Sequence, residues 1–233
     1  VSVNAQASQG FRLGGVNDPL NVPLCTDEDE AIFGGFQDYD DEKLWNYETG
    51  VKMRKGGVTL NAAVFYTDIT DLQVTLDAGS CSSRISFNVP DAHTAGVEFE
   101  LSAEPAEGVV LSLAGSFLNA EFDATVRDGD GDVIGGIEDG NRLASVPEVQ
   151  LAATASFNFP IDIWSASSEG FASASIQHVG SRFTQPSDQV AGAGEFVSGL
   201  PYGGASGTDV TAVDLELGPA EYLDPEAAAA GAA

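Results

Sequence analysis

The chain has 233 residues, of which 43% are hydrophobic and 9% aromatic, and this composition excludes general disorder. It carries 9 Lys and Arg against 36 Asp and Glu, and the resulting net charge of −27 repels phosphate backbones and excludes nucleic acid as a partner. The sequence has no run of about 18 apolar residues that would form a transmembrane helix.

In chain order, the sequence predicts strands where apolar and polar residues alternate, because successive side chains of a strand point to opposite faces. The stretch Val149–Phe159 alternates without interruption, and a strand of about 9–11 residues can cross a bilayer when tilted. Weaker alternation predicts an eighth strand at Val210–Leu217. The seven stronger candidates are Val1–Phe11, Lys43–Arg54, Val58–Thr75, Arg84–Glu104, Val109–Phe122, Val149–Phe159 and Gly170–Phe183.

The connections between these strands alternate in length. Lys55–Gly57 and Pro105–Gly108 have the size of hairpin turns, and the connection 161–169 is moderately short. Short turns at one rim and long loops at the other are typical of outer-membrane barrels. We therefore expect an all-β fold, an antiparallel transmembrane β-barrel segment of about seven or eight strands that belongs to a larger barrel and is open by itself. The long polar connections are 12–42, 76–83, 123–147 and 184–209.

The two faces of the predicted strands differ in chemistry. One face is apolar and is expected to contact membrane lipid, as at Leu151, Ala153, Ala155 and Phe157. Aromatic residues at both ends of the predicted spans suit the two membrane interfaces, whereas packing in a soluble sandwich core is the alternative. The opposite face suits a water-filled or plugged lumen because its side chains are polar, namely Asn46, Glu48, Lys52, Asn61, Glu98, Glu100 and Gln150.

The ends of the sequence predict a partial barrel. Val1 already lies in a strand pattern without a preceding signal sequence, so we expect the chain to begin within a larger protein. Alternation is lost after Leu217, and residues 218–233 are rich in alanine. We therefore expect a barrel portion at 1–217 and a low-complexity tail at 218–233, with two unpaired sheet edges that prevent the chain from working as a complete barrel.

Cysteine and histidine are sparse. Cys25 and Cys81 lie in two long connections, which emerge at the same rim if alternate loops of the barrel point the same way. A disulfide in an oxidising compartment is one expectation, and two small buried thiols are the other. His93 and His178 have no second ligand at metal-binding spacing, so we expect structural roles for both.

One acidic stretch has some features of a calcium-binding loop. Asp128, Asp130 and Asp132 alternate with glycines, which makes them candidate Ca²⁺ ligands. An EF-hand loop, however, has Gly at its sixth position and a bidentate Glu at its twelfth, and these positions here hold Val133 and Asp139. A flexible acidic loop is therefore the alternative. We expect no resident metal or other cofactor.

A series of short motifs, spread in order over residues 1–217, resembles the later barrel strands of TonB-dependent outer-membrane receptors. The motifs are Ser8–Arg12, Leu44–Lys52, Leu60–Tyr66, Asp71–Gln73, Asn88–Ala92, Gly96–Glu100, Gly140–Leu143 and His178–Arg182. The resemblance implies a bacterial outer-membrane barrel of roughly 22 strands closed by a plug. It also implies uptake, energised through TonB, of ferric siderophores, haem, cobalamin or glycans. We expect the plug and the terminal strands to lie outside this sequence.

The function predicted from this resemblance is active uptake of a scarce nutrient such as a ferric siderophore. A soluble secreted acidic β-protein that binds glycans or calcium is one alternative, and a passive porin is another. No catalytic motif is convincing, so we expect no enzyme. The candidate ligand contacts are acidic residues of the first long connection, for which a solvated charged face is the alternative. They are Asp27, Glu28, Asp29, Glu30, Asp38, Asp40 and Asp41.

Overall fold

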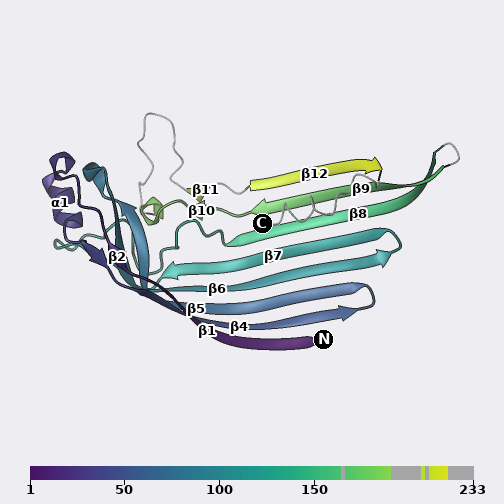
Figure 1. Ribbon diagram of the computed structural model, residues 1–233, viewed down its shortest axis with the longest axis horizontal. Helices are drawn as coiled ribbons and strands as arrows, with labels where there is room; N and C mark the ends of the chain where they lie inside the picture. Colours follow the sequence, from purple (N-terminus) through teal and green to yellow (C-terminus); the bar gives the residue numbers. More distant parts are fainter. Residues whose placement is uncertain (164–165, 190–205, 208–209, 220–233) are drawn as a thin grey trace.

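The computed structural model describes residues 1–163, 166–189, 206–207 and 210–219. Its main element is an antiparallel eight-stranded sheet in the order β1-β4-β5-β6-β7-β8-β9-β12 (Figure 1). This up-and-down sheet confirms the predicted fold class and the weaker eighth strand. The strands are β1 (Ser2–Arg12), β4 (Glu42–Lys55), β5 (Val58–Asp77), β6 (Arg84–Ala106), β7 (Val109–Phe122), β8 (Val149–Ile163), β9 (Ala166–Val179) and β12 (Val210–Pro219).

The short connections all lie at one end of the sheet and the long ones at the other (Figure 1). Gly56 and Gly57 join β4 to β5 with φ angles of 57° and 78°. A two-residue hairpin turn of this kind needs positive φ at both positions, which glycine adopts without steric cost. Gly108, with φ 77°, ends the equally short turn between β6 and β7. The predicted alternation of short and long connections is therefore present.

The structure corrects the predicted end of β8. The strand continues past Phe159 to Ile163, through a segment that we expected to be a connection. Pro160, which has no backbone N–H to donate to a ladder, follows directly after the predicted strand end. However, β7 pairs with β8 only as far as Phe157, and Pro160 pairs with Glu169 of β9. Proline is tolerated there because β8 has a neighbour on one side alone at that point.

The predicted strand 170–183 is wrong at both ends. β9 begins at Ala166 and ends at Val179, and Arg182–Phe183 forms a separate short strand, β10. The sheet ladder stops where the backbone N–H of Gly180 donates to the carbonyl of Val149, at 2.8 Å. β12 reaches Pro219, two residues beyond its predicted end, and the rest of the predicted tail lies outside the described residues.

Most fully buried side chains lie at the end of the sheet with the long connections. We call this region the loop cap and define it as residues 13–41, 72–89 and 122–148. Its short elements are β2 (Gly15–Val16), η1 (Val22–Leu24), α1 (Asp27–Phe33), β3 (Asp38–Tyr39) and η2 (Gly79–Cys81). Its hydrophobic core is formed by Phe33, Leu76, Ala78, Cys81, Ile85, Phe87, Val89, Phe122, Ile134 and Ile137.

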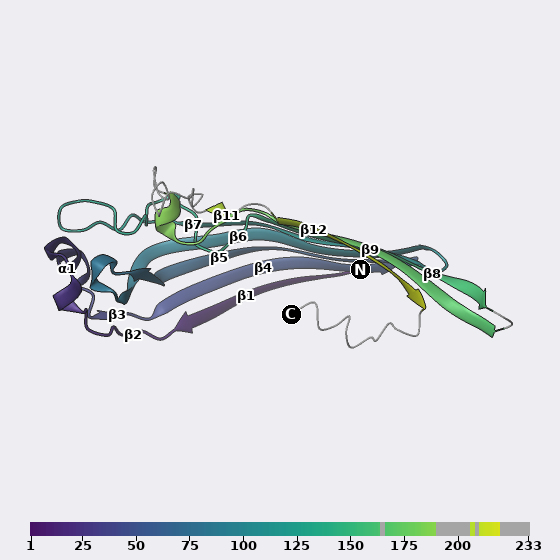
Figure 2. The same ribbon diagram turned by 90° about the horizontal axis from the view of Figure 1, so that it is seen from above.

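The rest of the sheet is a single curved layer (Figure 2). Among the described residues its edges are β1 and β12, which do not pair with each other, so this part of the chain does not close a barrel. The short elements β10, η3 (Pro186–Gln189) and β11 (Ser206–Gly207) follow β9. No helix in the described part of the chain is long and apolar enough to cross a membrane.

Candidate ligand conduit and its outer loops

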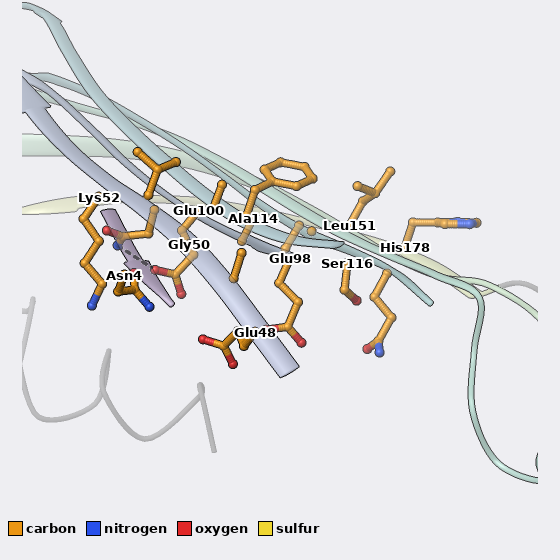
Figure 3. A pocket seen from close by; sticks show the side chains of 18 of the residues that line it. Asn4, Glu48, Gly50, Lys52, Glu98, Glu100, Ala114, Ser116, Leu151 and His178 are labelled. Atoms are coloured by element: carbon orange, nitrogen blue, oxygen red, sulfur yellow. Dashed lines mark hydrogen bonds between the residues drawn. The ribbon is translucent and has the colours of Figure 1, made fainter. Parts of the chain in front are cut away.

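One face of the sheet carries polar side chains around a hollow of about 450 Å³. In Figure 3, Asn4, Glu48, Lys52 and Glu98 project to the same side of the sheet. Cross-strand register brings residues from different hairpins into rows on this face. One row is Asn4, Gly50, Ala63, Glu98, Ser116 and Gln150, and the next is Lys52, Asn61, Glu100, Ala114, Ala152 and Gln177.

The chemistry of this polar face is acidic. Glu48, Glu98 and Glu100 line the hollow, and Lys52 is the single Lys or Arg among the described residues that line it. Asn61 Nδ2 donates to Glu100 Oε2 at 3.2 Å. The small side chains between the charged ones, such as that of Ala114, leave the hollow open. The face can therefore bind polar groups of a neighbouring protein segment or a solute.

The opposite face is apolar. Figure 3 shows Leu151 and His178 projecting away from the polar face. Large apolar side chains on this face are exposed to solvent in the isolated chain, including Val64, Val97, Leu113 and Ile176. Aromatic pairs stack at its two ends: Trp45 with Tyr47 near the loop cap, and Phe157 with Phe159 near the short turns, with ring centroids 6.1 and 5.4 Å apart. An exposed apolar face bounded by aromatics suits a lipid environment.

Three side-chain amides fix the first long connection to the β5–β6 hairpin. Gln73, which is 9% exposed, donates from Nε2 to the carbonyls of Leu13 and Asp40, both at 3.0 Å. Asn88 accepts from the backbone N–H of Asp40 at 2.7 Å and donates to its carbonyl at 3.0 Å. Asn17 makes the same double contact with the backbone of Ser86, at 2.9 and 2.6 Å. These bonds satisfy backbone groups of the connection and of β6 with side-chain partners.

The Gln73 and Asn88 amides lie within motifs that carried the sequence resemblance. Asn17 had no sequence signal, because nothing marks one asparagine among many polar residues of a long loop as the partner of a distant strand. Glu42 was also missed as a contact: its Oε2 accepts from the backbone N–H of Gln73 at 2.8 Å. These four side chains make the first connection part of the loop cap.

A disulfide links the same connection to the next loop. Cys25 and Cys81 are bonded, with Cα atoms 4.1 Å apart and a sequence separation of 56. Beside the bridge, the Asp29 carboxylate accepts from the backbone N–H of Ser80 at 2.8 Å and from the hydroxyls of Ser80 and Thr26. These hydrogen bonds, with that of the Ser80 hydroxyl first, hold the pKa of Asp29 below its ordinary value of 3.8.

The acidic residues proposed as ligand contacts divide into two groups. Asp29 and Asp41 are engaged within the protein, since the Asp41 carboxylate accepts from the backbone N–H of Gly14 at 2.7 Å. The remaining carboxylates are exposed and have no hydrogen-bond partner within the described part of the chain. They belong to Asp27, Glu28 and Glu30 on α1, Asp38 on β3, and Asp40.

The acidic loop considered for calcium is a tight turn. Asp128 Oδ1 accepts from the backbone N–H groups of Asp130 and Asp132 at 3.0 and 2.8 Å. Arg127 donates to the carbonyl of Gly131 at 2.8 Å. No group of three His, Cys, Asp or Glu side chains within the described ranges could hold a metal ion. This geometry gives no support to the calcium alternative.

The last long connection before β8 is held by Arg142, another motif residue. Its guanidinium donates to the carbonyls of Val146 and Ser181, both at 3.1 Å, and lies 3.5 Å from the Glu148 carboxylate. It also lies 5.2 Å from the centre of the Phe183 ring. Sequence reasoning placed Arg142 in the family pattern without assigning these partners.

The fold and its two faces agree with a comparison with known families. Residues 1–218 match the family model described as TonB dependent receptor-like, beta-barrel. The chain therefore belongs to the β-barrel domain family of TonB-dependent receptors, which are bacterial outer-membrane proteins. This membership confirms the resemblance found in the sequence. It also excludes the soluble secreted alternative, which needed two packed sheets where the structure has a single main layer.

Similar proteins are longer than this chain. The pesticin receptors of Yersinia enterocolitica and Yersinia pestis are 33% identical to it over 121 residues, which is 52% of this chain and 16% of theirs. The ferric yersiniabactin uptake receptor FyuA from Yersinia pestis has a similar fold, with a TM-score of 0.61 and 23% identity over 93% of this chain and 27% of that one. BauA, the ferric preacinetobactin receptor from Acinetobacter baumannii, has a TM-score of 0.56 and 15% identity over 91% and 26%.

Proposed function

We propose that the chain forms part of the wall and the outer loops of a TonB-dependent receptor that takes up a ferric siderophore. The main supporting observation is the asymmetry of the sheet, which has a polar hollow on one face, an apolar opposite face and a loop cap at one end. The names of FyuA and BauA, both receptors for ferric siderophores, support this cargo class.

In this proposal the polar face lines the barrel lumen. Asn46, Glu48, Asn61, Glu98, Glu100 and Gln150 would contact a plug domain, through which TonB acts, or the solute that passes beside it. Leu151, Ala153, Ala155 and Phe157 would contact lipid. The chain itself performs no chemistry in this function. It supplies a wall and a prearranged set of loops.

The loop cap would face the outside and meet the cargo first. Its exposed carboxylates on α1 and at Asp38 and Asp40 are the candidate contacts, because their oxygens are not used within the cap. The disulfide and the amide contacts hold these residues in place before the cargo arrives. Prearranged loops bind with a smaller loss of conformational freedom than loops that must order on binding.

The test is uptake by cells that lack the intact receptor and then receive it back. In iron-limited medium, we expect the receptor to restore growth on one ferric siderophore of a panel, and growth to stop when TonB is deleted. Restored growth without TonB would instead favour the passive porin. No growth on any ferric siderophore would contradict the proposed cargo.

The candidate contacts can be tested in the same cells. Asp27→Asn, Glu28→Gln and Glu30→Gln in combination should weaken binding of the active siderophore. Glu107→Gln is the matched control, because Glu107 is an exposed acidic residue in the short turn at the opposite end of the sheet. Equal binding by both variants would remove α1 from the ligand site without affecting the uptake assignment.

A further inference from the structure

His93 lies on β6, paired with Glu121 near the end of β7, where the chain enters the connection 123–148. Its ring has a hydrogen-bond acceptor at each nitrogen. Nδ1 lies 2.8 Å from both carboxylate oxygens of Asp123, and Nε2 lies 3.0 Å from Oδ1 of Asn119. The Tyr66 ring stacks on the imidazole with centroids 5.8 Å apart. An imidazole between two acceptors makes both hydrogen bonds only when both nitrogens carry protons.

Glu121 prevents Asn119 from adapting to a neutral His93. Asn119 Nδ2 donates to Glu121 Oε1 at 2.7 Å, which turns its Oδ1 toward the imidazole. A half-turn of the amide would offer His93 a donor, but it would then direct Oδ1 at the Glu121 carboxylate. When His93 is neutral and Glu121 is ionised, the Asn119 Oδ1 therefore faces another acceptor in either orientation of the amide. All the hydrogen bonds within the group formed by His93, Asn119 and Glu121 are made only when the group holds one additional proton.

The charges around His93 also favour this proton. Asp68 on β5 and Glu121 on β7 are its cross-strand neighbours, Asp91 precedes it on β6, and Asp123 is its partner. Arg142 is paired with Glu121 across a β-bridge, but its guanidinium binds Glu148 and two backbone carbonyls. Carboxylates near an imidazole stabilise its charged form.

Because of the position of Asp123, protonation of His93 affects how the connection 123–148 is held. Its backbone N–H donates to the carbonyl of Asp91 at 3.0 Å, and the connection returns to the sheet where the N–H of Gly140 donates to the carbonyl of Phe122 at 2.9 Å. Between these points Ile134 and Ile137 pack into the core of the loop cap. The ion pair between His93 and Asp123 therefore holds the base of a cap segment.

We propose that protonated His93 is a pH-sensitive latch that fixes the connection 123–148 to β6, and that the latch loosens as the external pH rises. Loss of the proton replaces the ion pair with Asp123 by a weaker hydrogen bond and leaves two acceptors facing each other near Asn119. This inference goes beyond the proposed uptake function and does not depend on which solute is carried.

Hydrogen–deuterium exchange of the intact receptor in detergent tests the latch. After correction for the intrinsic effect of pH, we expect peptides covering 123–140 to exchange about fivefold faster near pH 8 than near pH 5.5, as expected for the loss of roughly one hydrogen bond. Equal corrected rates at the two pH values would overturn the proposal.

Three variants separate the latch from a merely structural role. His93→Gln should remove the pH dependence, and Glu121→Gln should reduce it, because a glutamine at 121 can donate to Asn119 and let the rotated amide serve a neutral His93. His178→Gln is the control: His178 also lies in the sheet, paired with Leu151 of β8, but its Nδ1 lies 3.0 Å from the Thr211 hydroxyl and it takes no part in the contacts with Asp123, Asn119 and Glu121. Unchanged pH dependence in His93→Gln or in Glu121→Gln would contradict the proposal, as would its loss in His178→Gln.

Discussion

The loop cap and the middle of the sheet are built from the same strands but are stabilised by different surroundings. Phe122 and Phe117 both lie on β7. Phe122 is 1% exposed because the long connections cover it, whereas Phe117 is 47% exposed on the apolar face. The cap thus has an interior of its own, while the middle of the sheet has none in the isolated chain. Substitutions in the cap should change stability in detergent and in lipid alike. Substitutions on the apolar face should change stability mainly when the sheet lies in a membrane.

The two regions also use different polar contacts. The middle of the sheet is held by a regular backbone ladder between antiparallel strands. The cap is held by side chains that replace the ladder, such as Gln73 and Asn17, and by the Cys25–Cys81 bridge. Irregular segments need such partners because each buried backbone group must be hydrogen-bonded.

The largest expected effect compares the two phenylalanines. Phe122→Ala should destabilise the cap by about 3–5 kcal/mol, because it leaves a cavity in a packed core. Phe117→Ala should change the stability of the receptor much less in detergent, since its ring is 47% exposed and stacks on the Phe99 ring at the surface of the sheet, with centroids 6.4 Å apart. Urea unfolding of the intact receptor in detergent measures both. Similar losses for the two variants would contradict the division into cap and sheet.

The next largest effect is expected from the disulfide. Replacing both Cys25 and Cys81 by Ala should cost up to about 4 kcal/mol in a chain-entropy estimate, reduced by the closure that the sheet already provides. The loss should concentrate in the cap, so limited proteolysis should cut residues 13–41 faster while the sheet remains protected. Non-reducing peptide mapping of the unmodified receptor should recover the two cysteines in one linked peptide pair.

The lipid-facing side can be tested on β8. Ala153→Arg should cost about 2–4 kcal/mol if residue 153 lies near the middle of the bilayer, because the charge must enter hydrocarbon. Thr154→Arg, one position along the same strand, places the charge on the polar face and should be tolerated. Folding of the two variants into lipid vesicles gives the comparison. Equal tolerance would count against β8 as a membrane-spanning strand.

The smallest effect concerns Asp29 in the cap. Its folded-state pKa lies below the ordinary value of 3.8, with the hydrogen bonds from Ser80 as the main cause. The stabilisation is therefore complete above that value and is lost as the pH falls through the lower, folded-state pKa. Asp29→Asn should make the hydrogen-exchange protection of α1 change less with pH below about pH 4. Asp27→Asn is the control. Equal pH responses of the two variants in hydrogen-exchange measurements at low pH would contradict this role of Asp29.

The alternation of apolar and polar residues was sufficient to predict the strands of the main sheet. Lys43–Arg54 and Val149–Phe159 identify strands with two different faces because the side-chain period of a strand is fixed by backbone geometry. Loop lengths then predicted the two rims, and the order of motifs predicted the family. Pro160 shows the limit of local reasoning, because its effect depended on how far the neighbouring strand β7 extends.

By itself, then, the sequence determined the antiparallel strands, their polar and apolar faces, the rim that carries the long connections and the receptor family. Only the tertiary structure decided which polar atoms of the loops meet. It joined Cys25 to Cys81, directed Asp29 to Ser80, and gave His93 two acceptors. The physical reason is that strand periodicity is a local property of the backbone. Contacts between loops depend on how distant segments pack, and composition leaves many such pairings open.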